Sequence, residues 1–108
     1  MTHAFQIVQP SGILDGDKTN DLRREIIDLI DNGHTVILVD LQGVNFMNSS
    51  GIGALVATLK AVRTGQAEMY LCSLGEQLQM IFQLTKMDKV FKIFTNRDEF
   101  EENIMSLK

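Results

Sequence analysis

Two serine hydroxyls stand beside two glycines in residues 46–53, a stretch that reads F-M-N-S-S-G-I-G. A serine becomes a nucleophile when a base lies within hydrogen-bond reach, and a glycine-rich turn that opens a helix can expose backbone N–H groups to a phosphate. A serine at the start of a helix can also cap it or carry a regulatory phosphate. The stretch is therefore compatible with a nucleophile, a phosphate-binding loop, a helix cap or a switch.

A serine nucleophile is disfavoured because the chain offers neither a suitable base nor the usual motif. The two histidines are His3, close to the N-terminus, and His34, in the turn after the first expected helix. The nucleophile-elbow pattern G-x-S-x-G is missing, since Asn48 stands where its first glycine would be. We therefore expect no catalytic residues and no enzymatic activity.

Nucleotide and metal sites are disfavoured on similar grounds. The chain contains neither G-x-x-x-x-G-K-S/T nor G-x-G-x-x-G. One cysteine and two distant histidines do not form a set of zinc ligands. We therefore expect neither a cofactor nor a bound metal.

Asp40 raises another alternative, because it ends the strongest strand pattern, as the phospho-acceptor of a receiver domain does. A receiver also needs an acidic pair after its first strand to hold magnesium, and here residues 9–11 are Q-P-S. Asp40 is therefore expected to cap or hydrogen-bond the adjacent loop.

The composition is that of one globular domain spanning residues 1–108, with 44% hydrophobic and 22% charged residues. The net charge is −4 and the basic residues are scattered, which disfavours direct binding of nucleic acid.

No run approaches the roughly 18 apolar residues of a membrane span, so we expect no membrane insertion and a cytoplasmic location. Cys72, the single cysteine, is expected to be a buried core residue.

The elements that position the serines follow from the apolar pattern. Alternation in residues 5–9 predicts an edge strand that Pro10 stops, and the continuous apolar run 36–39 predicts a strand covered on both faces. Strands and helices then alternate, which predicts an α/β fold with an at least partly parallel sheet. The expected elements are a strand at 5–9, a turn or brief strand at 12–16, a helix from 17 to 31, a strand at 35–40, a helix over 52–62, a strand at 69–72, a helix at 77–84, a strand at 90–94 and a helix at 98–107.

The junction before the second helix is a candidate docking surface, because it joins polar residues to apolar anchors. Ser49 or Ser50 is the expected N-cap, and Asn48 has the same capacity. The two glycines of the stretch are expected to permit close approach, while Met47 and Ile52 are expected to offer apolar contact.

Two segments resemble the STAS domain, a family named for sulphate transporters and anti-sigma factor antagonists. Residues 36–41 (V-I-L-V-D-L) and 44–53 (V-N-F-M-N-S-S-G-I-G) are similar to its signature of a buried strand, a loop and D-S-S-G-I/L-G, with Asn48 in place of the usual aspartate. Residues 12–15 (G-I-L-D) are similar to its early G-x-L-D element. The resemblance implies the STAS fold, a central mixed, largely parallel sheet of about four to five strands with about four α-helices.

The resemblance also implies a function, that of the stand-alone bacterial anti-sigma factor antagonists. In that group the first serine of the pair, here Ser49, is phosphorylated by an anti-sigma factor that is also a serine kinase, and a PP2C-type phosphatase removes the phosphate. The unphosphorylated protein, a monomer or weak dimer, binds the kinase. The alternative is a STAS subunit of a transporter or stress-sensing complex. The expected partner-binding residues are Asp15, Met47, Asn48, Ser49, Ser50, Gly51, Ile52 and Gly53.

Overall fold

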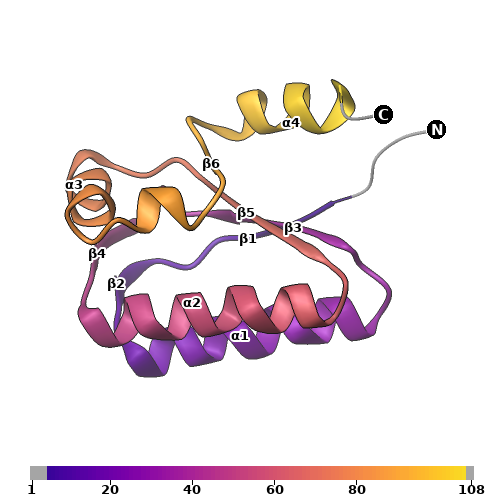
Figure 1. The fold of residues 1–108 in the computed structure, drawn as a ribbon, viewed down its shortest axis with the longest axis horizontal. Coiled ribbons are helices and arrows are strands. Elements are labelled where there is room, and N and C mark those ends of the chain that lie inside the picture. Colours follow the sequence, from indigo (N-terminus) through magenta and orange to yellow (C-terminus); the bar gives the residue numbers. More distant parts are fainter. Residues whose placement is uncertain (1–4, 107–108) are drawn as a thin grey trace.

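The computed structural model describes residues 5–106, and it alternates strands with helices as expected (Figure 1). His3, considered above as a base for a serine nucleophile, and Leu107, the expected end of the last helix, lie outside the described residues. The strands are β1 (Gln6–Val8), β2 (Gly12–Leu14), β3 (Val36–Asp40), β4 (Val44–Met47), β5 (Glu68–Cys72) and β6 (Ile93–Phe94). The helices are α1 (Gly16–Asp31), α2 (Ser49–Thr64), α3 (Glu76–Leu84), α4 (Arg97–Ser106) and the short 3₁₀ helix η1 (Met87–Lys89).

Two parallel sheets form the centre of the fold. The larger sheet has the strand order β1-β3-β5-β6, and β2 pairs with β4 in a separate two-stranded sheet. All four strand pairings among the described residues are parallel. The expected largely parallel sheet with four helices is thus confirmed, and β1 is an edge strand as its alternation predicted.

Helices cover the larger sheet on both faces (Figure 1). Because side chains alternate across a strand, Ile37 and Val39 join the core cluster under α1 and α2, whereas Leu38 joins a second cluster with Phe100 of α4. All three β3 residues are fully buried, which confirms that this strand is covered on both faces. Cys72 is buried in the second cluster, as expected.

The two long helices follow from their apolar spacing. Leu22 and Ile26 bury one face of α1, and Leu55, Leu59 and Val62 bury one face of α2. The α1 helix is followed by Gly33, whose φ of +95° is a left-handed conformation that glycine adopts without steric cost. None of the helices within residues 5–106 combines the length and the apolar character that a membrane span requires.

The short elements near the C-terminus differ from the expectation. A strand was expected over residues 90–94, but only Ile93–Phe94 pairs with β5. The segment before it turns through η1, which begins after Lys86 in a left-handed conformation with φ of +63°. The backbone N–H groups of Val90 and Phe91, at the start of the expected strand, donate to the Met87 carbonyl oxygen of this turn instead of to a neighbouring strand. No element was expected over residues 44–47, which form β4.

Candidate functional site

Two strand-to-helix junctions lie side by side at one end of the molecule. The β2 and β4 strands run parallel with Leu14 opposite Met47, so the residues that follow them, Asp15 and Asn48, are neighbours. A carboxylate oxygen of Asp15 accepts a hydrogen bond of 2.9 Å from the backbone N–H of Lys18 and caps α1. Asp15, one of the expected partner-binding residues, therefore lies at the same end of the molecule as the serines.

Asn48, rather than a serine, is the N-cap of α2. Its amide oxygen accepts a hydrogen bond of 2.8 Å from the backbone N–H of Gly51, and its backbone is extended, as an N-cap requires. The expectation that Ser49 or Ser50 caps the helix is therefore wrong. Both serines lie in the exposed first turn, and within residues 5–106 no hydrogen bond engages either hydroxyl.

Gly51 brings the first turn of α2 against the end of β2. A β-carbon at this position would lie 2.0 Å from the carbonyl oxygen of Leu14, a distance that non-bonded atoms cannot adopt. Gly53 does not share this role, because a β-carbon there would have no heavy atom within 4 Å. The expectation that these glycines permit close approach is thus confirmed for Gly51 and wrong for Gly53. Across the junction, a β-carbon at Gly16 of α1 would lie 3.4 Å from that of Ser50, so the two helices begin together.

Met47 cannot offer the apolar contact expected of it, because its side chain is 1% exposed and lies in the core. The alternation of the β4 strand turns Phe46 outward instead, with 39% of its surface exposed. Ile52 is half-buried and packs against the core. Apolar surface beside the serines thus comes from a residue that the sequence reasoning missed. The signal was present in two adjacent apolar residues, which a strand must point to opposite faces.

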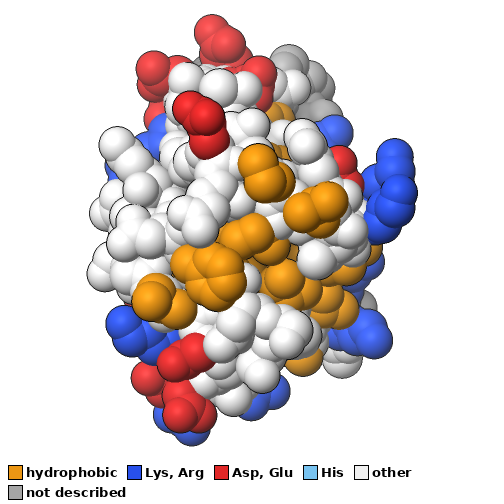
Figure 2. Space-filling view, turned by 90° about the vertical axis from the view of Figure 1, so that its left-hand side faces the viewer, with side chains coloured by type: hydrophobic (Ala, Val, Ile, Leu, Met, Phe, Trp, Pro, Cys, Tyr) orange, Lys and Arg blue, Asp and Glu red, His pale blue; other side chains and the backbone are white. Residues whose placement is uncertain are grey.

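Four exposed apolar side chains lie on β2, β4 and α3, which pack together at this end of the molecule. Figure 2 shows hydrophobic side chains gathered on the end that carries β2, β4 and α3 in Figure 1. Ile13 lies next to Phe46 in the β2–β4 register and is 53% exposed. The α3 helix, which packs on β4, adds two residues that are more exposed still, at 61% and 76%. We define the apolar face as Ile13, Phe46, Met80 and Leu84.

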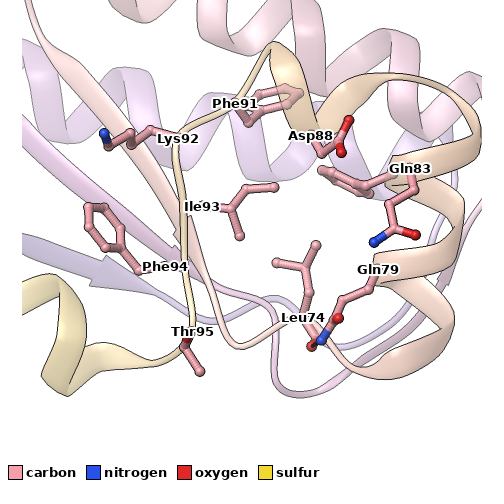
Figure 3. Close-up of a pocket in the computed structure, with 10 residues that line it drawn as sticks. Leu74, Gln79, Gln83, Asp88, Phe91, Lys92, Ile93, Phe94 and Thr95 are labelled. Carbon is pink, nitrogen blue, oxygen red and sulfur yellow. Dashed lines mark hydrogen bonds between the residues drawn. The ribbon is translucent and has the colours of Figure 1, made fainter.

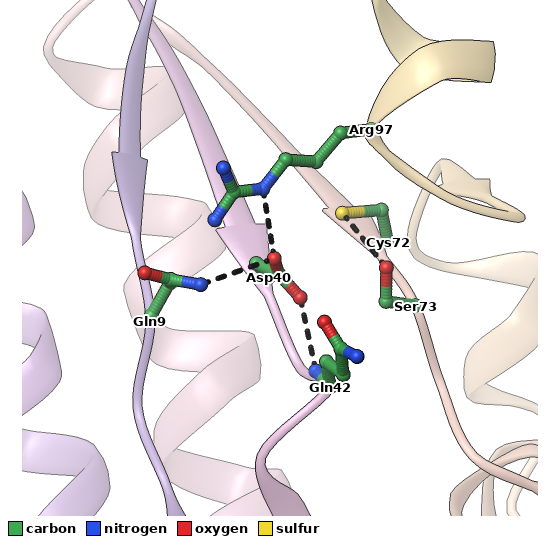
Figure 4. A network of polar contacts seen from close by, with 6 residues as sticks. All are labelled: Gln9, Asp40, Gln42, Cys72, Ser73 and Arg97. Carbon is green, nitrogen blue, oxygen red and sulfur yellow. Dashed lines mark hydrogen bonds and ion pairs between the residues drawn. The ribbon is translucent and has the colours of Figure 1, made fainter.

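The buried carboxylate of Asp40, at the end of β3 in the larger sheet, connects this strand to three other segments of the chain (Figure 4). Asp40 is 2% exposed and accepts hydrogen bonds from the side chains of Gln9, at 3.3 Å, and Arg97, at 2.9 Å. The backbone N–H of Gln42 donates to its other oxygen at 3.0 Å, which confirms the expected bond to the adjacent loop. The ion pair with Arg97, at the start of α4, was not foreseen. Every one of these bonds holds structure together, so Asp40 is a structural residue.

The remaining nucleophile, Cys72, is not activated. Burial has the largest effect and raises the pKa of its thiol, while the Ser73 hydroxyl lowers it, the Asp40 carboxylate raises it and Arg97 lowers it, each by less, so that the pKa is raised. Because the thiolate is the reactive form, a raised pKa makes this cysteine a poor nucleophile. Within the described chain, no three His, Cys, Asp or Glu side chains come together as metal ligands.

The chain belongs to the STAS domain family, whose family model matches residues 2–100. The anti-sigma-B factor antagonist of Staphylococcus aureus is 27% identical over 89 residues, which is 82% of this chain and 82% of the relative. The resemblance inferred from the motifs at residues 12–15 and 36–53 is thus confirmed.

Two solved structures share the fold. The anti-sigma factor antagonist SpoIIAA of Bacillus, in its unphosphorylated form, matches with a TM-score of 0.71 and 18% identity over 94% of this chain and 90% of that chain. A sulfate transporter family protein from Wolinella succinogenes matches with a TM-score of 0.82 and 14% identity over 95% and 86% of the two chains. The fold is therefore common to both branches after which the family is named.

Proposed function

We propose that this chain is an anti-sigma factor antagonist that works as a phosphorylation-controlled protein-binding switch. In its unphosphorylated form it binds an anti-sigma factor that is also a serine kinase. The kinase phosphorylates Ser49, which ends the interaction, and a PP2C-type phosphatase restores the binding form. The observation that carries the proposal is the exposed Ser49 hydroxyl, which makes no hydrogen bond within residues 5–106 and begins α2 in a STAS-family chain.

The position of Ser49 favours a phosphate without refolding of the domain. A phosphoserine carries about −1.5 to −2 charges near neutral pH. The unpaired N–H groups and the positive end of the dipole at a helix N-terminus stabilise such a charge. Asn48 caps the helix without adding a negative charge beside the phosphate, whereas the aspartate usual in the family would add one.

The cost of phosphorylation therefore falls on the interface. The apolar face (Ile13, Phe46, Met80 and Leu84) lies at the same end of the molecule as Ser49, and a partner that covers it would also remove water from the serine. Burying a phosphate without a counter-charge is strongly unfavourable. A penalty of about 2.7 kcal/mol is enough to weaken binding a hundredfold.

Ser49 is favoured over Ser50 as the modified residue. Ser50 faces the start of α1, since a β-carbon built at Gly16 would lie 3.4 Å from that of Ser50. In the family resemblance the first serine of the pair carries the phosphate, which supports the same assignment. Asp15 and Gly51 have supporting roles in this proposal, since they cap α1 and seat α2 against β2.

Mapping the phosphate tests the proposal. The purified protein is incubated with ATP and the anti-sigma factor kinase that co-purifies with it, and the site is identified by mass spectrometry. We expect one phosphate on Ser49, its loss in Ser49→Ala, and normal labelling in the neighbouring control Ser50→Ala. Full labelling of Ser49→Ala would overturn the site assignment.

A STAS subunit of a transporter or stress-sensing complex is the second candidate, and the similar fold of the Wolinella succinogenes protein favours it. Both candidates are protein-binding modules and neither is an enzyme. Affinity capture with unphosphorylated protein separates them. Recovery of a serine kinase supports the switch, whereas recovery of a membrane transporter or a large sensor complex without a kinase supports the alternative.

A further inference from the structure

A cavity of about 480 Å³ lies between α3 and β6 (Figure 3). Small-molecule sites in proteins typically have volumes of about 300–1,000 Å³. None of residues 46–53 lines this cavity, so it is separate from the proposed phosphorylation site.

Apolar side chains form the inner wall of the cavity. Leu74, which follows β5, and Ile93 of β6 point toward each other across the cavity in Figure 3. Phe82 and Phe91 close one end as a tilted aromatic pair with ring centroids 6.0 Å apart. Because both phenylalanines are buried in the core, this wall is rigid, and it suits an apolar, ring-sized body.

Two amide side chains line the α3 side. Gln79 and Gln83 are one helical turn apart and share a face of α3. The amide nitrogen of Gln79 already donates a hydrogen bond of 2.8 Å to the backbone oxygen of Leu74, which leaves the Gln79 oxygen as an acceptor. Within residues 5–106 the Gln83 amide has no hydrogen-bond partner, so it can donate and accept. The matching ligand group pairs an N–H with a C=O, as a carboxamide or lactam does.

Charged groups do not face the interior. Lys92 lines the cavity through its backbone, and Figure 3 shows its side chain directed to the other side of β6. The Asp88 side chain is exposed at the rim, where water screens it. An anionic head group would lose hydration in the cavity and meet no counter-charge, and a cationic one would meet only the water-screened Asp88 carboxylate at the rim. The cavity therefore favours an uncharged ligand.

We propose that the cavity between α3 and β6 binds a small, uncharged molecule with an apolar ring and a carboxamide or lactam edge. The ring packs between Leu74 and Ile93, and the amide edge pairs with Gln79 and Gln83.

Three probes with one ring and different head groups test the proposal. Benzamide, benzoate and benzylammonium are titrated into the isotope-labelled full chain, and backbone amide chemical shifts are followed by NMR. We expect saturable benzamide binding in about the millimolar range, with the shifts centred on residues 74, 79, 83 and 93. Each charged probe should bind at least tenfold more weakly. No saturable benzamide binding, shifts centred elsewhere, or equal binding of a charged probe would overturn the proposal.

Two glutamine variants on one helix test the polar contact. Gln83→Leu should weaken benzamide binding at least fivefold, whereas Gln77→Leu, an exposed position on α3 that does not line the cavity, should leave it unchanged. Both side chains are exposed, so circular dichroism should show the wild-type fold for each variant. Equal affinity of Gln83→Leu and wild type would contradict the proposed role of the amide.

Discussion

Asn48 changes how the serine pair is interpreted at the scale of single residues. If a serine capped α2, its hydroxyl oxygen would accept a hydrogen bond from a backbone N–H of the helix. Because the Asn48 amide makes that bond, both hydroxyls stay free for other chemistry. The uncharged cap also adds no negative charge to the first turn of α2, which contains no acidic residue. Asn48 thus makes a capping bond that an aspartate at this position could also make.

Tyr70 provides a test of packing at a single residue, because it is the only tyrosine in the chain. Burial raises the pKa of its hydroxyl from 10.0 to about 12, and the hydrogen bond to the Glu68 carboxylate contributes. We expect near-ultraviolet absorbance of the folded protein to show phenolate formation near pH 12. The raised pKa means that protonated Tyr70 contributes to the free energy of unfolding. This contribution is complete below pH 10 and is lost as the pH rises to 12, because between these values the unfolded chain releases the Tyr70 proton and the folded chain keeps it.

Glu68→Gln is the control for this titration. It removes the negative charge but not the burial, so the midpoint should fall while staying above the ordinary value of 10.0. A wild-type midpoint at the ordinary tyrosine value would contradict the described packing of Tyr70.

The site could be predicted from sequence in part. The junction at residues 48–51 and its proximity to Asp15 follow from motifs and from parallel pairing. Alternation places Phe46 and Met47 on opposite faces of a strand, but it does not say which of the two faces the core, so the burial of Met47 and the exposure of Phe46 do not follow from the sequence alone. Nor does a list of residue types say which of three adjacent polar side chains reaches the N–H of Gly51.

At the scale of elements, the long helices could be predicted from the sequence more fully than the short strands β4 and β6 could. The α1 and α2 helices each have 16 residues, so their apolar periods repeat over several turns and stand out from chance. The β4 and β6 strands have four and two residues and owe their existence to neighbours distant in sequence. The strand β4 forms because β2 offers it a parallel edge. Short pairings of this kind are decided by tertiary contacts that local patterns do not encode.

The two glycines of α2 form a matched pair that tests how this helix is seated. Gly51→Ala should lower the free energy of unfolding by about 2–4 kcal/mol, because the new methyl group meets the Leu14 backbone. Gly53→Ala points into open space on an exposed helix face and should raise it by about 0.5–1 kcal/mol. Urea unfolding measures both values. Similar effects at the two positions would show that α2 does not approach β2 as described.

At the scale of the whole molecule, the two faces of the larger sheet are covered unequally (Figure 1). Two long helices cover one face, whereas α4 alone among the described helices packs on the other. The pair between Asp40 and Arg97 fastens the start of α4 to the sheet. Phe100 and Ile104 add the apolar contacts that hold the rest of the helix.

Removing one partner tests this attachment. Arg97→Ala leaves a buried carboxylate with two remaining donors and should lower the free energy of unfolding by about 1–2 kcal/mol, less than for a fully buried pair because the Arg97 side chain is 39% exposed. Arg24→Ala breaks the exposed pair with Asp21 and should change nothing measurable. Denaturant unfolding compares them. Equal stabilities of the two variants would refute the role given to Asp40.

The apolar face gives the molecule one end suited to a partner. Phe46→Ala should weaken binding of the anti-sigma factor kinase about tenfold while the fold is retained, because a large exposed aromatic side chain is lost from the contact. Val90→Ala removes an exposed apolar side chain outside this face and should bind as the wild type does. Binding is measured by surface plasmon resonance. Wild-type affinity of Phe46→Ala would place the interface elsewhere.

The central claim is that a phosphate on Ser49 excludes the partner without disturbing the domain. Isothermal titration calorimetry of the anti-sigma factor kinase against unphosphorylated and stoichiometrically Ser49-phosphorylated protein tests it directly. We expect unchanged circular dichroism and binding at least about a hundredfold weaker for the phosphorylated protein, which corresponds to about 2.7 kcal/mol. Equal affinity of the two forms would contradict it.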